Sequence, residues 1–270
     1  TSNEEKREYL YIYNGVLKGG FTYSFLDNKK NPLVAKLEYV AHPFQMLEYS
    51  NRAVYATKKD LTFLEYRKAV AESEKLLTEC GLPALELQEV YSLDAETMKA
   101  RYQSYLNSSG DTRYEWSKED EAYLIHFRQT QDGIPFINRL WDEQVRSASD
   151  PVETEIFAYY TKDGLISIRA SSTYNIGKEL EEKPIINASE ALRILLNDYA
   201  EDIESLDTKV FSMELNYVAI HGKDGFQIVP AWVFGTSRCE EMNYRDKPRY
   251  REKYFVINAF TGKRLRTVAE

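Results

Sequence analysis

Alternation of apolar and polar side chains along the chain predicts antiparallel strands. The run 211–217 alternates in this way, which is the period of a sheet with one solvated face. A turn-rich segment, 221–225, and a second β-rich run, 226–234, follow it, and together they predict a hairpin. Because Pro230 has no backbone N–H to donate, its strand is expected at a sheet edge or with a bulge at that residue. Strands are expected near residues 85–92, 120–128, 153–160, 165–170, 209–220, 225–235 and 253–260.

Helical spacing is found in two longer segments and one shorter one. The first segment spans about residues 60–79, and its buried stripe is expected to hold Phe63, Tyr66, Val70 and Leu77. The second, near 188–204, starts with a capping box at Asn187 and Glu190. Its apolar face is expected to hold Leu192, Leu195, Leu196, Tyr199 and Ile203. Burial of that face predicts that Leu196→Ala costs about 2–5 kcal/mol of stability. The shorter helix runs from Asp94 toward Asn107.

The order of these elements indicates one unit used twice, a helix followed by antiparallel strands. The charged segment 177–184, which ends in proline, is the best boundary between the two copies. We therefore predict an α+β fold with three parts: a strand-rich extension over 1–59, a helix–sheet repeat with an inserted helix over 60–180, and a second repeat over 181–270. In each repeat the helix is expected to cover one face of the sheet while the other face is solvated.

Composition and charge limit the class of protein. The apolar fraction of 43% supports a sizeable core, and the net charge of −8 disfavours nucleic-acid binding, which needs a basic face. The longest uncharged stretch, 225–237, is too short to cross a bilayer. The polar segment 1–8 is interpreted as a solvated leader or tether. Cys80 and Cys239 lie in no metal or redox motif, and whether they form a disulfide stays open.

Tyrosine is the most abundant aromatic residue, with 21 Tyr against 12 Phe and 3 Trp. Its apolar ring and polar tip suit half-exposed antiparallel sheets, so packing is the first interpretation. Aromatic faces can also stack on sugars. A cell-surface carbohydrate-binding protein or weak glycosidase is therefore the alternative hypothesis, and an intracellular enzyme is a third that rests only on the low cysteine content.

A search for catalytic signatures finds none of the common ones, including HExxH, GxSxG, GxxxxGK[ST] and GxGxxG. The three histidines, His42, His126 and His221, are far apart in sequence, and His126 is interpreted as a half-exposed strand residue. Charge runs among the acidic residues are interpreted as solvated faces. We therefore predict no catalytic residues, no metal site and no cofactor.

Two parts of the chain resemble known regulatory modules. The segment His126–Phe136 resembles the Phe-x-Gln-x-x-x-Gly-x-Pro strand and turn of the PepSY and thermolysin-type propeptide superfamily, with Gln129, Gly133 and Pro135 at the motif positions. The second half is similar to the Yyc-type extracytoplasmic regulators of Gram-positive cell-wall sensor kinases. The segments that carry this similarity are 186–192, 229–232 and 254–262, and the last of them contains the motif positions Asn258 and Gly262.

The resemblance implies an α+β repeat protein on the outer face of a bacterial cytoplasmic membrane, tethered by an N-terminal helix or as a lipoprotein. It also implies a binding or inhibitory role without catalysis. The expected partner is a protein or peptide of the cell envelope, such as a membrane sensor protein, with no nucleic acid and with membrane contact by the tether only. The candidate contact residues are Tyr217, Pro230 and Trp232 in the predicted hairpin.

Overall fold

A computed structural model describes residues 6–13, 20–27, 37, 40–41, 54–109, 115–138, 141, 154–178, 182–201, 208–222, 225–240 and 249–265. The chain divides into two compact units, the first made of Thr1–Thr130 with Thr154–Asn175 and the second of Gln131–Glu153 with Ile176–Glu270. Each unit contains an antiparallel sheet and at least one helix, which confirms the α+β class. The units do not coincide with the expected ranges 1–59, 60–180 and 181–270, because strands from the first range join the sheet of the next.

The sheet of the first unit has the strand order β1-β2-β8-β7-β5-β4-β3, and the neighbouring pairs are antiparallel. Its strands are β1 (Lys6–Tyr13), β2 (Gly20–Asp27), β3 (Ala56–Thr57), β4 (Leu85–Leu93), β5 (Ala122–Gln131), β7 (Glu155–Thr161) and β8 (Gly164–Ser171). Four of these strands lie where alternation predicted them, near 85–92, 120–128, 153–160 and 165–170.

Helix α2 (Tyr66–Glu79) occupies the second half of the range expected for the first helix. It begins at Tyr66 rather than near residue 60 because the Asp60 carboxylate accepts a hydrogen bond from the Tyr66 N–H (3.0 Å), which holds the preceding residues in a loop. It stops at the expected glycine, since Gly81 takes a φ of +84° and Leu82 N–H donates back to Leu77 O. Helix α3 (Ala95–Ser109) is the expected inserted helix, and a short 3₁₀ helix, η2 (Lys118–Asp120), precedes β5.

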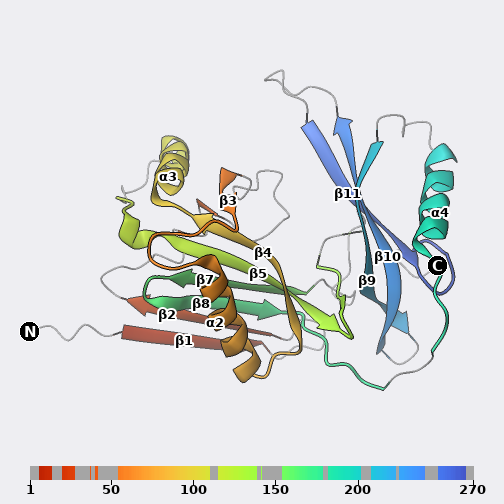
Figure 1. Ribbon diagram of the computed structural model, residues 1–270, viewed down its shortest axis with the longest axis horizontal. Coiled ribbons are helices and arrows are strands. Elements are labelled where there is room, and N and C mark those ends of the chain that lie inside the picture. The colour runs from red at the N-terminus through yellow and green to blue at the C-terminus, as the bar shows by residue number, and fades with distance from the viewer. Residues whose placement is uncertain are drawn as a thin grey trace, which may run out of the picture. The chain divides into compact units, whose positions relative to one another are not determined.

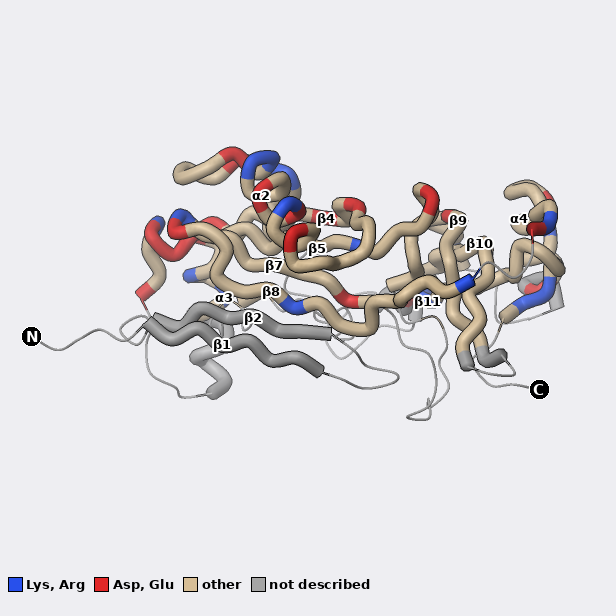
Figure 2. Tube along the Cα trace, turned by 90° about the horizontal axis from the view of Figure 1, so that it is seen from below, with Lys and Arg blue, Asp and Glu red and all other residues tan. Residues whose placement is uncertain are grey.

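Strands β4, β5, β7 and β8 of the first sheet pack against other residues on both faces, so the expected solvated face is wrong for this part of the unit. One face packs against α2, which Figure 2 shows lying over β4, β5 and β7, through Leu77 together with Tyr123 and Ile125. The other face, which includes Leu124 and Tyr159, is covered by side chains from α3 and from residues far away in sequence: Leu37, Val40, Ala41, Met98, Tyr102 and Trp116. Strand β5 is therefore buried along consecutive positions, as in a sheet that lies between two layers.

The second unit holds a three-stranded sheet of order β11-β10-β9, with α4 (Ala188–Glu201) against one face (Figure 1). Its elements are β6 (Ile134–Pro135), β9 (Thr208–Gly222), β10 (Gly225–Glu240) and β11 (Arg249–Asn258). The predicted hairpin is β9 and β10, whose turn residues 223–224 lie outside the described residues. The face away from α4 packs Val218, Ala231, Val233 and Val256 against Ile137.

The buried side of α4 differs from the expected one. Ala191 and Leu195 are buried against Phe234 and Ile257, whereas the Leu196 side chain is 54% exposed. Adjacent helical residues are about 100° apart around the axis, so Leu195 and Leu196 cannot both face the sheet. The expected cost of Leu196→Ala is therefore wrong, and the side chains of Tyr199 and Ile203 lie outside the described part.

Pro230 lies on the central strand of the sheet, so the expectation of an edge or a local bulge there is wrong. The pairing of β11 with β10 ends at Asn258, opposite Ala231, and Pro230 O accepts from Ala259 N–H just beyond it (2.9 Å). Since the N and O of one strand residue point to the same side, the proline nitrogen faces the side where the ladder has ended. The bulge of β10 with β9 occurs instead between Gly235 and Thr236.

Candidate binding surface

The motif residue Gln129 is fully buried and ties β5 to a segment that follows β8. Its Nε2 donates to Tyr174 O and its Oε1 accepts from Tyr174 N–H, both at 2.7 Å. The side-chain amide thus satisfies both backbone groups of Tyr174, as a neighbouring strand would do. The geometry gives Gln129 a structural role within the first unit.

The motif residues Gly133 and Pro135 form the turn and short strand at the start of the second unit. Asp132 and Gly133 have φ values of +52° and +76°, a pair of left-handed residues that matches a tight two-residue hairpin turn. Pro135 is buried in β6. The chain then runs beside β9, where Ile137 N–H donates to Tyr217 O (3.0 Å).

The motif residues Asn258 and Gly262 shape the turn after β11. Asn258 Oδ1 accepts from Phe260 N–H (2.9 Å) and Thr261 N–H (3.1 Å), and Gly262 takes a φ of +69°. A Cβ on Gly262 would lie 3.2 Å from Ile194 Cδ1, so glycine also allows the turn to approach α4 closely. These two residues position the turn against the helix.

The structure brings the three expected contact residues onto one face of the second sheet, but it also packs them within the unit. Tyr217 and Pro230 are opposite each other in the register, and Trp232 points to the same face two residues later. Trp232 Nε1 donates to Ile186 O (2.9 Å), Pro230 is buried, and the Tyr217 ring lies 5.4 Å from that of Phe136.

The sequence predicted a strand over the first half of β9, but it did not single out this segment as a candidate surface, and it is the more open part of the strand. Val210, Phe211 and Met213 are 41%, 50% and 40% exposed, although they lie within four residues of each other. Strand β9 ends the sheet order, and residues 136–137 accompany it only around Tyr217. Within the described residues, no strand pairs with the outer side of 209–214. We call this segment the β9 edge.

A β-bulge arranges the side chains of the β9 edge. Ser212 pairs with Gly235 and Val210 with Thr236, which leaves Phe211 as the extra residue. A Cβ on Gly235 would lie 2.7 Å from Phe211 Cε2, so this ring rests over the glycine, and it meets the Tyr254 ring edge-to-face at 6.1 Å. The glycine in the middle of a strand was the one sequence signal for this arrangement.

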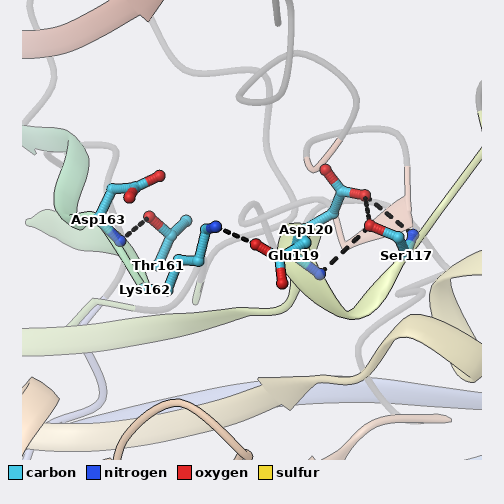
Figure 3. Close-up of polar contacts among 6 residues, drawn as sticks. All are labelled: Ser117, Glu119, Asp120, Thr161, Lys162 and Asp163. Carbon is cyan, nitrogen blue, oxygen red and sulfur yellow. Dashed lines mark hydrogen bonds and ion pairs between the residues drawn. The ribbon is translucent and has the colours of Figure 1, made fainter.

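Polar side chains at one corner of the first unit serve the local backbone (Figure 3). Asp120 Oδ2 accepts from both Ser117 N–H and Ser117 Oγ at 2.9 Å, and Ser117 Oγ in turn accepts from Glu119 N–H. Lys162, in the turn between β7 and β8, makes an ion pair with Glu119, and this hydrogen bond raises the pKa of Lys162. The arrangement caps η2 and attaches the neighbouring turn to it.

His126 is buried, at 8% exposure, so its expected half-exposed position is wrong. Its ring stacks on Phe157 (6.0 Å) and meets the edge of Tyr91 (5.9 Å). The layer that covers the second face of the sheet accounts for this burial. His42 lies outside the described residues, as does the side chain of His221.

In the described ranges, His, Cys, Asp and Glu do not gather in groups of three or more that could hold a metal ion. None of the described helices has the length and apolar character needed to cross a membrane. Cys80 is an exposed free thiol, and the side chain of Cys239 is not described.

Comparison with known proteins gives a fold likeness alone. No protein-family model matches the chain, and no curated protein sequence matches it. A solved structure of an uncharacterized protein from Eubacterium rectale ATCC 33656 is similar, with a TM-score of 0.69 and 16% sequence identity over 97% of this chain and 76% of that one. At this identity the likeness concerns the fold.

Proposed function

We propose that this protein is a non-enzymatic, extracytoplasmic binding or regulatory protein, tethered to the membrane as a lipoprotein or by a helix, that acts through protein or peptide contacts. The observation that carries the proposal is the β9 edge, where three apolar side chains are 40–50% exposed on the strand that ends the order of the second sheet in the described part of the chain. Natural sheet edges are usually protected by charges, short strands or cover, and open edges pair readily with another chain.

The order of elements supports a relation to the PepSY-like repeats. Helix α2 is followed by β4, β5 and β7, which lie side by side in the first sheet, and α4 is followed by β9, β10 and β11, which lie side by side in the second. Each helix packs on its own sheet. Helix α3 lies between β4 and β5 in sequence, where the proposed first repeat would carry its insertion.

Strand β9 is covered by its own unit around Tyr217 but exposes side chains over 209–214, and this difference favours a binding role for the exposed half. Around Tyr217 the strand is accompanied by Phe136 and Ile137 of its own unit. From Lys209 to Glu214 apolar side chains remain accessible instead, with Val210 and Met213 on one face of the sheet and Phe211 on the other, and exposed apolar side chains along a strand at the end of a sheet are typical of interaction sites.

Site-specific photo-crosslinking in the source cells tests the proposal. A photoreactive amino acid at Met213 is expected to give a discrete crosslinked protein or peptide in the cell-envelope fraction. The same amino acid at Leu196, which is more exposed but lies on α4, is the matched control. Equal crosslinking at both positions, or none at Met213, would contradict the proposal. So would a hydrolytic activity that survives repurification and disappears when one carboxylate is substituted.

A further inference from the structure

We infer that Arg101 on helix α3 forms a second binding site, which binds a small oxyanion through its guanidinium group. The chemistry that it recognises is that of a carboxylate or phosphate group, which presents two oxygens side by side. Helix α3 belongs to the first unit and the β9 edge to the second, so this site goes beyond the proposed function and does not depend on it.

Helix α3 buries a hydrogen-bond donor of Arg101. The residue is half-buried, and its Nε atom is buried and makes no hydrogen bond with the described residues. Every N–H of a guanidinium is a donor, and most buried donors in proteins have an acceptor. Because an N–H removed from water without an acceptor costs free energy, an acceptor that binds from solution would stabilise this position.

The charge of Arg101 has no partner of opposite sign in the described part of the chain, where no carboxylate forms an ion pair with it. The carboxylate of Asp94 acts electrostatically on Tyr55, as Arg101 does, but both of its oxygens are engaged at the start of α3. They accept hydrogen bonds from Thr97 N–H (2.9 Å) and Thr97 Oγ1 (2.8 Å). This carboxylate therefore caps the helix instead of pairing with the arginine.

The hydroxyl of Tyr55 does not neutralise Arg101 either. It donates a hydrogen bond to Val40 O (3.0 Å), and burial raises the pKa of Tyr55 by more than the charge of Arg101 lowers it. The hydroxyl therefore stays neutral and supplies no negative charge. Folded proteins rarely bury a charge without pairing it, so an anion from solution is the partner that fits Arg101.

The surroundings of Arg101 strengthen its interaction with an anion. Its neighbours on α3, Met98 and Tyr102, belong to the buried cluster that also contains Tyr55 and Trp116. Two opposite charges attract each other more strongly beside such apolar side chains than in water. Because the Nε atom is itself buried, the ligand is small or presents its charged group at one end.

The shape of the guanidinium selects the class of anion. Its N–H groups donate in parallel to the two oxygens of a carboxylate or phosphate, whereas chloride is a single atom without paired acceptors. The chain has a net charge of −8, so its overall field does not attract anions. Binding of an oxyanion would therefore report a local site.

Thermal melting of the full chain in sodium phosphate, sodium acetate and sodium chloride at one ionic strength tests this site. Phosphate or acetate is expected to raise the Tm of the wild type relative to chloride, in a saturable way, and Arg101→Met should abolish this increase. Arg193→Met, a matched change at an exposed arginine of α4, should keep it. Any general effect of a salt on stability is common to both variants, and the two oxyanions distinguish a phosphate ligand from a carboxylate.

Nuclear magnetic resonance of the wild type provides a measurement that does not depend on how Arg101→Met folds. The Nε–Hε resonance of Arg101 is assigned by its absence in Arg101→Lys, which keeps the positive charge. Titration with phosphate or acetate is expected to shift this resonance in a saturable way and to leave that of Arg193 unchanged. If neither oxyanion shifts it, or if the increase in Tm is the same in Arg101→Met and Arg193→Met, the oxyanion site is ruled out and the proposed function is unaffected.

Discussion

The hydroxyl of Tyr159 on β7 donates a hydrogen bond to Ala41 O, 118 residues earlier in the chain, at 3.0 Å. Tyr55 does the same to Val40 O, also at 3.0 Å, and both rings are buried. Tyr123 donates to Leu64 O and accepts from Leu61 N–H. These three tyrosines attach peripheral backbone to the sheet, so their presence has an explanation in packing and hydrogen bonding.

Tyr159→Phe is expected to lower the free energy of unfolding by about 1–3 kcal/mol, because Ala41 O would be left buried without this partner. Urea denaturation measures the change. Tyr66→Phe is the control, since that hydroxyl only accepts from the exposed Arg67 side chain, and it should cost less than about 0.5 kcal/mol. Equal effects in the two variants would show that the buried hydrogen bond does not stabilise the unit.

Alkaline pH is expected to destabilise the first unit. An unfolded tyrosine ionises near pH 10. Burial, and then the hydrogen bond and charge of Glu72, raise the pKa of Tyr160 to about 12. The folded state therefore binds the Tyr160 proton more tightly than the unfolded state does. The contribution of this difference to the free energy of unfolding is fully present below pH about 10 and is lost as the pH rises to about 12.

Urea denaturation midpoints measured between pH about 10 and about 12 check whether stability declines in this range. Burial also raises the pKa of Tyr55 and Tyr123, so Tyr160→Phe should make the decline shallower without abolishing it. An identical decline in the wild type and the variant would contradict the role given to Tyr160.

Gln129→Leu is expected to destabilise the protein, because it removes the buried amide that hydrogen-bonds to both Tyr174 N–H and Tyr174 O. Each polar group left unsatisfied costs about 1–3 kcal/mol when buried. Thermal and urea unfolding measure the loss. Gln131→Leu is the matched control, since that amide contacts the exposed Asp132 side chain, and the reverse ranking of the two variants would refute the structural role of Gln129.

Leu195→Ala should cost about 2–5 kcal/mol, whereas Leu196→Ala should cost less than about 0.5 kcal/mol. The reason is that the Leu195 side chain is 1% exposed and that of Leu196 is 54% exposed. Both variants have the same change in helix propensity, so the difference in their unfolding free energies reports burial alone. Similar costs would mean that α4 presents a different face to the sheet.

Local patterns in the sequence located most elements because the signals are local. The Asn187 cap is an example, since its Oδ1 accepts from Glu190 N–H at 2.9 Å as expected. Strand alternation located β4, β5, β7, β8, β9, β10 and β11 for the same reason. Helical spacing alone does not show whether Leu195 or Leu196 faces the sheet, because that depends on where the sheet lies relative to the helix.

The features that were missed depend on residues distant in sequence. The burial of His126 follows from the cover over the second face of the first sheet, to which Leu37 and Met98 contribute. The exposure of Phe211 follows from a bulge opposite Gly235, which only strand pairing reveals. The candidate surface was therefore expected around Trp232, where aromatic residues gather, rather than along the β9 edge.

Amide hydrogen exchange of the full chain, measured with and without a peptide derived from the partner that is crosslinked at Met213, tests the central claim most directly. The outward-facing amides of 209–214 should exchange rapidly in the free protein, because the described residues provide no strand beyond them, and slow down at least tenfold when the peptide binds. Protection confined to other parts of the chain, or none at all with the peptide bound, would contradict the account.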